Sequence, residues 1–300
     1  MQRVAACYSL TLSLMDVPRF GGEPLNEQTT KPVLSIVIPA YNEAQRIEPS
    51  LERIREYLAS RGEPIEVLVV DDGSRDGTSG VVEQEVPRFR ESGLELRLLG
   101  DGRNHGKGAA VRVGMLAARG DVVLFSDADL SAPIDELPKL VDPIRAGTVD
   151  IVIGSRALDR SLVGVHQSAA REVAGRIFNL LMRVLTGMPF RDTQCGFKAF
   201  RADAAREVFA RVLIERFGFD VEALYVARKL GFSVSEVPVV WNNVEGSTVG
   251  LMSGLNGYAD VLRVRLNDIR GRYGIRPGRA AKATAGRPAA RTEIGRDRGE

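Results

Sequence analysis

The chain has 300 residues, of which 44% are hydrophobic and 27% are charged, as in an ordinary soluble globular protein. Its formal net charge of +2 argues against nucleic acid as the main partner, because nucleic-acid-binding domains carry a clear excess of basic residues. The two cysteines and the two histidines lie far apart in the sequence. This spacing argues against a disulfide framework and a zinc site, and it predicts a reducing, cytoplasmic location.

The two ends of the chain differ in composition from the body. The apolar stretch at 4–15 is interrupted by Ser and Thr and is shorter than the roughly 20 apolar residues that a membrane-spanning helix needs. A signal peptide is the alternative, but no small-residue cleavage pattern follows cleanly. Because the C-terminal end is rich in Ala, Gly, Arg and Pro, it cannot bury enough apolar surface to order itself. We expect a poorly ordered leader at 1–30, one folded domain at 31–270 and a disordered basic tail at 271–300.

From residue 33 onward, predicted strands and helices alternate along the chain. Apolar runs predict strands at 33–40, 65–74, 94–100 and 121–129. Helical spacing or helix-favouring composition predicts helices at 47–59, 78–86, 107–118 and 131–144. Alternation at these lengths predicts an α/β fold with a mostly parallel, Rossmann-like sheet flanked by helices.

Polar residues gather just after three of these strands. In parallel sheets, ligands bind outside the carboxyl ends of the strands, so these positions are the candidate binding residues. They are Pro39, Tyr41, Asn42, Glu43, Asp71, Asp72, Asp127 and Asp129.

Asp127 and Asp129 are the candidate metal ligands. Side chains alternate along an extended segment, so both carboxylates should face the same side. Two hard oxygen ligands suit Mg²⁺ or Mn²⁺, which commonly bind through one or two carboxylates and substrate phosphates. The alternative is that Asp129 or Ser131 is the N-cap of the helix predicted at 131–144.

The glycine-rich stretch 102–108, GRNHGKG, is similar to a P-loop but departs from it twice. Three residues rather than four separate Gly102 from Gly106, and Gly108 replaces the Ser or Thr that would hold Mg²⁺. No G-x-G-x-x-G follows the first strand, so a dinucleotide-binding fingerprint is also absent.

The motifs of the first half resemble those of the family 2 glycosyltransferases of GT-A fold. They are IVIPAYNEAQRI, VLVVDDGSRDGT, NHGKGAAVRVGM and FSDADLSAP. The second half is similar to the dolichyl-phosphate β-glucosyltransferases and their bacterial polyprenyl-phosphate relatives, in IVIGSR, RDTQCGFKAF, RFGFDVEALYVARKLG and EVPVVWNNVEGSTV. The resemblance covers about residues 33 to 270. It implies a single catalytic domain that transfers a hexose, with glucose favoured, from a UDP-sugar to a polyprenyl phosphate with inversion and with Mg²⁺ or Mn²⁺.

The resemblance also implies roles on the donor side. Lys107 would approach the nucleotide, and Asp127 and Asp129 would hold the metal under its diphosphate. Asp71 would bond the uracil, and the rest of the nucleotide pocket would comprise Pro39, Tyr41, Glu43 and Asp72. One departure concerns Ser131, which stands where some related synthases have a Gln as an extra metal ligand.

On the acceptor side, the resemblance implies that Arg156 and Arg171 meet the acceptor phosphate and that Asp220 is the acidic residue of inverting members. A lipid monophosphate, with a second pKa of about 6, needs positioning more than deprotonation, and guanidinium groups supply positioning. A hydroxyl acceptor would instead need a general base, such as Asp220 or Glu222. The basic residues therefore favour a phosphate acceptor.

Three alternatives remain open. A soluble or saccharide hydroxyl could replace the lipid phosphate as acceptor. A nucleotidyltransferase would have a similar sheet and acidic site, but it usually needs a glycine-rich basic loop after the first strand. A sugar-nucleotide binding module without activity would tolerate loss of the Asp127 and Asp129 pair, which this chain retains.

Several other side chains, most of them within these motifs, are predicted to be structural. We expect Cys195 to be a buried small hydrophobe, Asp192 and Gln194 to order a turn, and Phe232 and Trp241 to pack in the core. His105 is either a loop residue or a diphosphate contact.

A predicted helix at 250–269 carries an apolar face made of Leu251, Leu255, Tyr258, Val261 and Leu262. Packing against the sheet is the first expectation, and a helix lying in a membrane surface is the alternative. The arginine-rich tail behind it could contact anionic lipid headgroups, which predicts peripheral attachment at the cytoplasmic face of a membrane.

Overall fold

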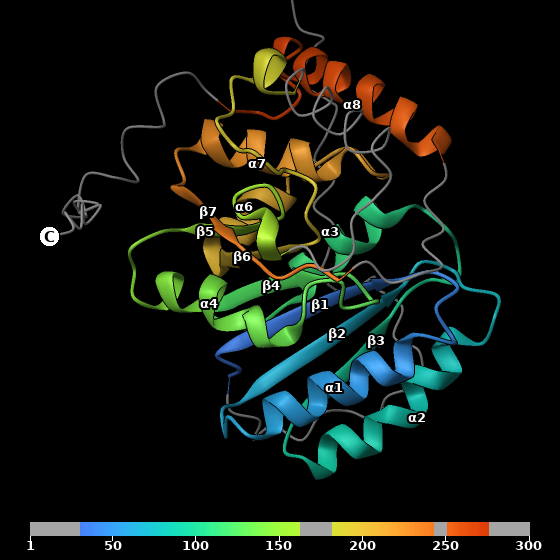
Figure 1. Ribbon diagram of the computed structural model, residues 1–300. Helices are drawn as coiled ribbons and strands as arrows, with labels where there is room; N and C mark the ends of the chain where they lie inside the picture. Colours follow the sequence, from blue (N-terminus) through green and yellow to red (C-terminus); the bar gives the residue numbers. More distant parts are fainter. Residues whose placement is uncertain (1–30, 163–181, 243–250, 276–300) are drawn as a thin grey trace, which may run out of the picture.

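The computed structural model describes residues 31–162, 182–242 and 251–275. Their centre is a seven-stranded sheet in the order β3-β2-β1-β4-β6-β5-β7 (Figure 1). The strands are β1 Leu34–Ala40, β2 Ile65–Asp71, β3 Glu95–Leu99, β4 Val122–Ser126, β5 Ile151–Ser155, β6 Phe197–Arg201 and β7 Val234–Pro238. The helices are α1 Ile47–Ala59, α2 Thr78–Glu91, α3 Lys107–Ala117, α4 Leu137–Arg145, α6 Ala202–Phe209, α7 Phe219–Leu230 and α8 Leu251–Ile269, with short 3₁₀ turns at Ile134–Glu136 and Arg160–Leu162.

The sheet is mostly parallel, as predicted. β1 pairs in parallel with β2 and β4, β2 with β3, and β5 with β7. Only β6 runs the other way, and it lies between β4 and β5. The four parallel strands of the first half therefore end at the same edge of the sheet, where their following loops meet.

Helices cover both faces of the sheet. α1, α2 and α4 lie on one face, and α3, α6 and α7 lie on the other, with α8 over α7 (Figure 1). Successive residues of β1 point to opposite faces, so Val37 packs with α3 and Ile36 packs with α1. The buried residues of α1 are spaced as its predicted apolar stripe, which confirms that helix.

Two predicted helix boundaries are wrong. α2 does not end at residue 86 but continues through Pro87 to Glu91, because the buried ring of Phe89 anchors its last turn. The helix predicted from residue 131 begins only at Leu137, after Pro133 and a 3₁₀ turn. Neither Asp129 nor Ser131 is therefore its N-cap.

The segment with Asp127 and Asp129 is a turn, so the expected extended geometry is wrong. β4 ends at Ser126, and the backbone N–H of Leu130 donates to the carbonyl of Asp127 at 3.2 Å. Leu130 has a φ of 48°, a left-handed conformation that closes this turn. The two carboxylates must therefore be placed by the turn and its neighbours and not by strand alternation.

The folded region extends beyond its predicted end at residue 270. Tyr273 is buried and its hydroxyl donates to a carboxylate oxygen of Glu222 at 2.8 Å, so the residues from 271 to 275 belong to the domain. The predicted leader and the rest of the predicted tail lie outside the described residues. Within the described ranges, no helix has the length and apolar character required to cross a membrane.

The predicted apolar face of α8 is divided between core and solvent. Val261 is buried, whereas the adjacent Leu262 is 58% exposed, because neighbours on a helix point about 100° apart. Leu266 and Ile269 are also exposed. The structure does not describe the side chains of the other predicted members, Leu251, Leu255 and Tyr258.

Candidate active site

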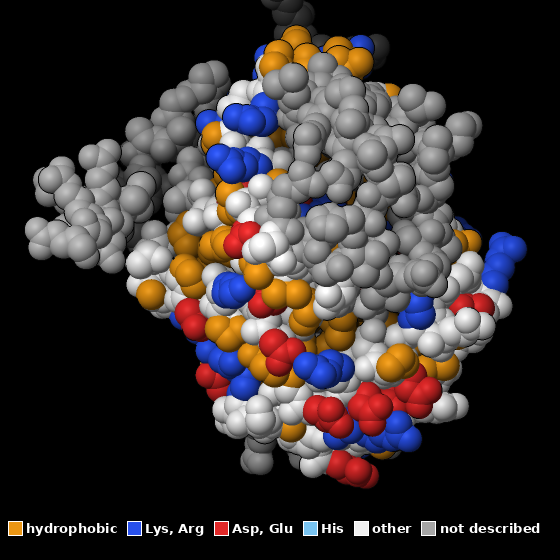
Figure 2. Space-filling view, in the orientation of Figure 1, with side chains coloured by type: hydrophobic (Ala, Val, Ile, Leu, Met, Phe, Trp, Pro, Cys, Tyr) orange, Lys and Arg blue, Asp and Glu red, His pale blue; other side chains and the backbone are white. Residues whose placement is uncertain are grey.

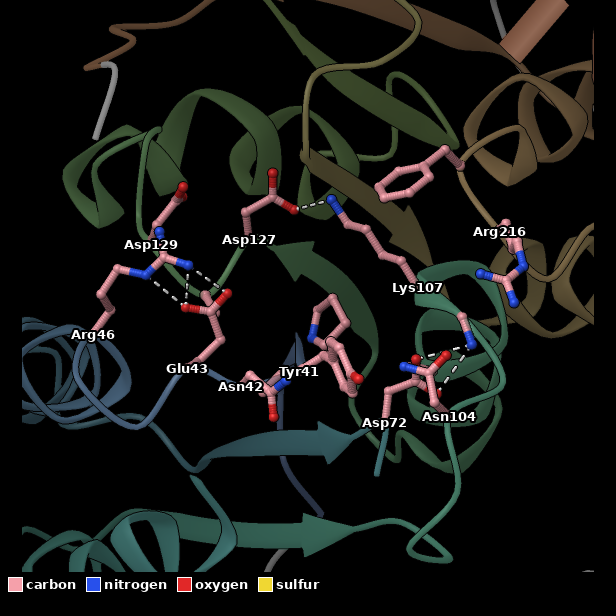
Figure 3. Close-up of a pocket in the computed structure, with 16 residues that line it drawn as sticks. Tyr41, Asn42, Glu43, Arg46, Asp72, Asn104, Lys107, Asp127, Asp129 and Arg216 are labelled. Carbon is pink, nitrogen blue, oxygen red and sulfur yellow. Dashed lines mark hydrogen bonds and ion pairs between the residues drawn. The ribbon is translucent and has the colours of Figure 1, made fainter. Parts of the chain in front are cut away.

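A cavity of about 460 Å³ opens at the carboxyl ends of β1, β2 and β4, beside the N-terminus of α3 (Figure 3). Eight of the predicted site residues line it, namely Pro39, Tyr41, Asn42, Glu43, Asp72, Lys107, Asp127 and Asp129. The structure does not bring Asp71, Arg156 or Asp220 into this lining, and Arg171 lies outside the described residues. Polar lining residues that the sequence reasoning did not assign to the site are Arg46, Asn104 and Arg216.

Lys107 and Asp127 form an ion pair inside the cavity. The Nζ of Lys107 lies 2.6 Å from Oδ1 of Asp127, and both side chains are about one quarter exposed. Burial acts to lower the pKa of Lys107, but the charges of Asp127 and Asp220 outweigh it and raise the pKa. Lys107 is therefore charged inside the cavity.

Asp127 is also held by the backbone of Gly196, from the predicted QCGFK motif. Its N–H donates to the carbonyl of Gly196 at 3.1 Å. A Cβ atom at position 196 would lie 2.1 Å from Oδ2 of Asp127, so only glycine leaves room for the carboxylate. This contact joins residues about 70 positions apart, and no local pattern in the sequence could reveal it.

Asp129 folds back on its own turn, since its Oδ1 accepts from the backbone N–H of Ser131 at 3.0 Å. Among the described residues, no group of three or more His, Cys, Asp or Glu side chains could hold a metal ion. The predicted ligands Asp127 and Asp129 both line the cavity and supply two carboxylates. This donor set fits Mg²⁺ or Mn²⁺, which complete their coordination with substrate phosphates and water.

Glu43 forms an ion pair with Arg46, a residue to which the sequence analysis gave no role. The Nε and Nη2 of Arg46 donate to the two carboxylate oxygens of Glu43 at 2.8 and 2.9 Å. Burial raises the pKa of Glu43, while Arg46 opposes that rise. The signal was present, because the two residues stand three positions apart at the start of a predicted helix.

The neighbouring Asn42 ties two loops together at the cavity edge. Its N–H donates to Oγ of Ser74 and its Oδ1 accepts from the N–H of Arg75, both at 2.9 Å. Asn42 has a φ of 55°, a left-handed conformation that asparagine tolerates well. The loop after β1 is thereby fixed to the loop after β2.

The adjacent side chains of Asp71 and Asp72 bind different loops. Asp71 accepts from the N–H of Ser74 at 2.9 Å and from the hydroxyl of Ser79, and it lines a second cavity of about 470 Å³. Asp72 borders both cavities and accepts from the backbone N–H groups of His105 and Gly106 at 2.7 and 2.9 Å. Burial raises the pKa of Asp72, and these two backbone bonds oppose the rise. Asp72 therefore fixes the loop before α3.

His105 is a loop residue in this structure. Its ring lies 2.9 Å from a carboxylate oxygen of Asp101, and about half of its side chain is exposed. The bond to Asp101 raises the pKa of His105. It borders the second cavity rather than the first.

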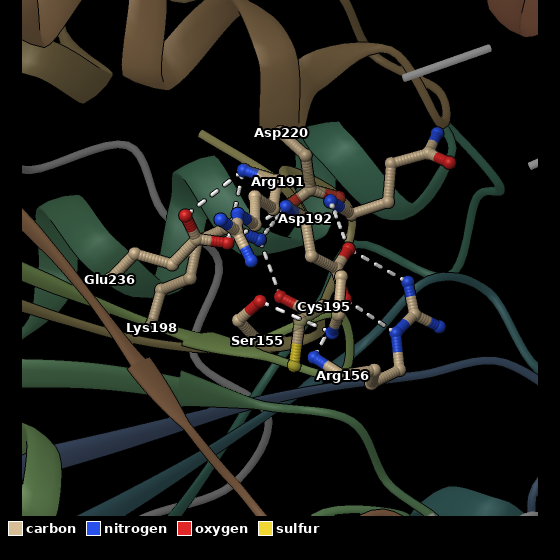
Figure 4. A network of polar contacts seen from close by, with 10 residues as sticks. Ser155, Arg156, Arg191, Asp192, Cys195, Lys198, Asp220 and Glu236 are labelled. Atoms are coloured by element: carbon tan, nitrogen blue, oxygen red, sulfur yellow. Dashed lines mark hydrogen bonds and ion pairs between the residues drawn. The ribbon is translucent and has the colours of Figure 1, made fainter. Parts of the chain in front are cut away.

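Arg156 belongs to a separate polar cluster (Figure 4). Its Nε and Nη2 donate to the two carboxylate oxygens of Asp192 at 2.7 and 2.9 Å, and its guanidinium lies 4.8 Å from the ring centroid of Trp241. Although burial opposes ionisation, Arg156 lowers the pKa of Asp192 to about 2. Asp192 also accepts the backbone N–H of Gln194 at 3.2 Å, which is the turn-ordering role predicted for it.

Asp220 lies next to this cluster and is bound by a buried lysine. The Nζ of Lys198 donates to Oδ1 of Asp220 at 2.5 Å and also bonds the carbonyl of Cys195. Lys198 is fully buried, and Asp220 is 6% exposed. Burial raises the pKa of Asp220, against the attraction of Lys198 and Lys107. The sequence reasoning did not identify Lys198.

The burial of Cys195 and Glu222 tests the roles that the sequence suggested for these two residues. Cys195 is fully buried, and burial raises its pKa to about 12, so it is an inert small hydrophobe as predicted. Glu222 is fully buried and accepts from the N–H groups of Leu213 and Ile214 at 2.8 and 2.7 Å, in addition to Tyr273. The suggestion that Glu222 is a general base is therefore wrong, because its oxygens are occupied.

Comparison with known proteins gives a consistent result. The family model for glycosyl transferase family 2 matches residues 35–209. The chain is 36% identical to a dolichyl-phosphate beta-glucosyltransferase of Trichomonas vaginalis, over 77% of this chain and 72% of the relative. It is 38% identical to the enzyme of that name from Drosophila melanogaster, over 75% and 71%, and 34% identical to that of Homo sapiens, over 80% and 77%.

Solved structures support the fold. Glucosyl-3-phosphoglycerate synthase from Mycobacterium tuberculosis, in complex with UDP, has a TM-score of 0.56 at 21% identity, covering 82% of each chain. Mannosyl-3-phosphoglycerate synthase from Rubrobacter xylanophilus has the same TM-score at 23% identity, covering 82% of this chain and 78% of the other. The GT-A fold expected from the motifs is confirmed. The chain belongs to glycosyl transferase family 2 and is a glycosyltransferase.

Proposed function

We propose that this protein transfers glucose from UDP-glucose to dolichyl or another polyprenyl phosphate, with Mg²⁺ or Mn²⁺ as cofactor. The main support is that relatives of 32–38% identity over 75–83% of the chain are named dolichyl-phosphate beta-glucosyltransferases. The cavity at the strand ends offers a place for the donor, and Tyr41 stands 43% exposed at its edge as a ring for the base. A solved relative by fold contains Mn²⁺ and UDP-glucose together.

On the donor side, Asp127 and Asp129 would hold the divalent cation, and Lys107 would meet the diphosphate. The cation would neutralise the charge that develops on the leaving diphosphate. Lys107 would exchange its ion pair with Asp127 for contact with a phosphate oxygen, since both side chains are partly exposed. The uracil contact proposed for Asp71 would require a base that reaches beyond the first cavity, toward the second.

On the acceptor side, Arg156 would position the lipid phosphate, with Arg171 as a second basic contact. Asp192 and Trp241 fix the plane of the Arg156 guanidinium, and its side chain remains 32% exposed. Asp220 already accepts a bond from Lys198, so we assign it to positioning rather than to proton removal. An acceptor phosphate that is ionised near neutral pH does not need a base.

We further propose that α8 contacts a membrane surface. Leu262, Leu266 and Ile269 are 58%, 42% and 76% exposed and lie one helical turn apart on one side of the helix. Figure 2 shows hydrophobic side chains at the top of the molecule, where the C-terminal part of α8 lies in Figure 1. Arg263 and Arg265 flank this stripe with side chains 68% and 43% exposed, which suits anionic lipids. The contribution of the basic tail and the cytoplasmic location stay predictions.

The activity is tested by incubating the purified protein with UDP-glucose, Mn²⁺ and a short polyprenyl phosphate. We expect a glucosylated lipid phosphate, and none in excess EDTA. The polyprenyl alcohol and 3-phosphoglycerate are the comparison acceptors. Transfer to either of these in preference to the lipid phosphate would contradict the proposed acceptor class.

The membrane contact is tested by flotation with anionic liposomes. Replacing Leu262 and Ile269 with Ser should weaken binding by about 100-fold or more, because each buried leucine or isoleucine contributes about 1.5–3 kcal/mol. Raising the salt concentration should weaken it further by screening the arginines. Ser replacement of Val184, an equally exposed apolar residue on another element, is the control. Unchanged flotation of the α8 variant would refute this contact.

A further inference from the structure

Three basic side chains line the donor cavity, and they differ in what they bind. Arg46 is paired with Glu43 and Lys107 with Asp127. Arg216 also lines the cavity, but among the described residues its guanidinium has no hydrogen-bond or ion-pair partner. Within the described part of the cavity lining, Arg216 is therefore the one cationic group without a polar partner.

The loop that carries Arg216 is held firmly from inside the domain. The N–H groups of Leu213 and Ile214 donate to one carboxylate oxygen of the buried Glu222. The carbonyl of Glu215 accepts from the N–H of Ala109, in the first turn of α3, at 3.0 Å. Arg216 is thus attached to a backbone that is fixed on both α7 and α3, as a binding residue requires.

The glycines of the GRNHGKG stretch explain how this loop approaches α3. A Cβ atom on Gly108 would lie 2.6 Å from the carbonyl oxygen of Ile214 and 2.8 Å from that of Arg216. A Cβ atom on Gly106 would lie 2.6 Å from the carbonyl oxygen of Glu215 and 3.0 Å from Cγ of Arg216. These glycines therefore seat the loop of residues 213–217 against the N-terminus of α3. That is a structural role distinct from the P-loop reading of the same stretch.

The charge and shape of the cavity indicate what Arg216 would bind. Figure 3 shows Arg216 across the cavity from Arg46 and Asp129, with Lys107 between them. Among the described lining residues, four acidic side chains face only two basic ones if Arg216 is left out, so Arg216 reduces the negative charge that a diphosphate would meet. A guanidinium group provides a planar fork that matches two phosphate oxygens.

We propose that Arg216 binds the diphosphate of the nucleotide-sugar donor, on the side of the cavity opposite Asp129. This inference rests on the proposed function, because it assumes a nucleoside diphosphate donor. Arg216 then acts with Lys107 on the diphosphate, and its loop connects the donor cavity to α7, the helix that carries Asp220.

The test compares UDP with uridine, which lacks the phosphates. Calorimetry with UDP and Mn²⁺ should show Arg216→Gln binding about 10- to 100-fold more weakly than wild type, the range for one charge-assisted hydrogen bond. Ligand-observed NMR should show unchanged uridine affinity. Arg216→Lys should fall between wild type and Gln, because it keeps the charge but loses the fork. Arg90→Gln, at an exposed position on α2 outside the cavity, is the matched control and should bind UDP normally.

Several results would overturn the inference. Equal losses for UDP and uridine would mean that Arg216 supports the loop or meets the nucleoside. An unchanged UDP affinity with a raised KM for the lipid phosphate would assign Arg216 to the acceptor. If wild-type protein and Arg216→Gln bind UDP equally well, the inference about Arg216 is refuted and the proposed donor still stands. Wild-type protein that fails to bind UDP refutes the proposed donor as well.

Discussion

The cavity proposed to bind the donor and the cluster around Arg156 and Asp220 differ in how far their ion pairs are exposed. In the donor cavity, Lys107 and Asp127 are each about one quarter exposed and can change partners. In the other cluster, Lys198 and Asp220 have side chains 1% and 7% exposed, and Asp192 has one 4% exposed. When one member of such a buried ion pair is removed, water cannot reach the remaining charge and solvate it. The pair of Lys107 and Asp127 can thus rearrange around a ligand, whereas the pair of Lys198 and Asp220 is fixed in place. Arg156, with a side chain 32% exposed, is the part of the second cluster that is open to solvent.

The largest effect should come from the donor carboxylates. Asp129→Asn removes a charge from the proposed metal site, and metal contributions of several kcal/mol predict a loss of about 1000-fold or more in kcat. The fold should persist, because the one hydrogen bond of the Asp129 side chain within the described ranges is to its own turn. UDP binding measured by calorimetry should lose its dependence on Mn²⁺. Full activity of this variant would show that Asp129 is not part of a metal site.

A matched pair of lysine substitutions probes the contrast directly. Lys198→Met leaves Asp220 as a buried carboxylate without its ammonium partner, which should reduce the free energy of unfolding by about 3–5 kcal/mol. Lys107→Met breaks a partly exposed pair and should reduce it by only about 0–1 kcal/mol. Urea denaturation of both variants measures the two values. Equal values would abolish the distinction between the two regions.

The smaller of the two effects on activity concerns the acceptor. Arg156→Lys keeps the charge but loses the fork, so kcat/KM for the lipid phosphate should fall by about 10- to 100-fold while donor affinity stays unchanged. Asp220→Asn should be less damaging than loss of an obligatory base. Kinetics of both variants with a lipid phosphate and a hydroxyl acceptor check this. If Arg156→Lys keeps its activity while Asp220→Asn loses it, the result would favour the hydroxyl acceptor.

The same contrast explains how much of the molecule could be predicted from sequence. Donor residues such as Tyr41 and Asp127 directly follow apolar runs, so strand periodicity and the rule for parallel sheets place them at one edge. The contact of Gly196 with Asp127 and the ion pair of Lys198 with Asp220 depend on the antiparallel insertion of β6. That pairing joins distant parts of the chain, and no local pattern specifies it.

Periodicity also fails where a helix has two apolar sides. Val261 and Leu262 are both apolar, and their spacing cannot tell which one meets the core. The turn at Asp127 shows a second limit, because an apolar run does not mark the residue at which a strand ends. Arg216 shows a third, since a basic residue in a loop acquires a role only from the cavity that it faces.

The bond between Tyr273 and Glu222 determines how short the chain can be made. Glu222 holds the backbone of the loop with Arg216, and Tyr273 is the third donor to its carboxylate. A chain cut after residue 270 would remove the hydrogen bond from Tyr273 to this buried carboxylate. The free energy of unfolding should then fall by about 1–3 kcal/mol. The loss would fall on the loop that borders the donor cavity, some fifty residues upstream of the cut. A protease that trims the C-terminus past Tyr273 would therefore act on nucleotide affinity from a distance.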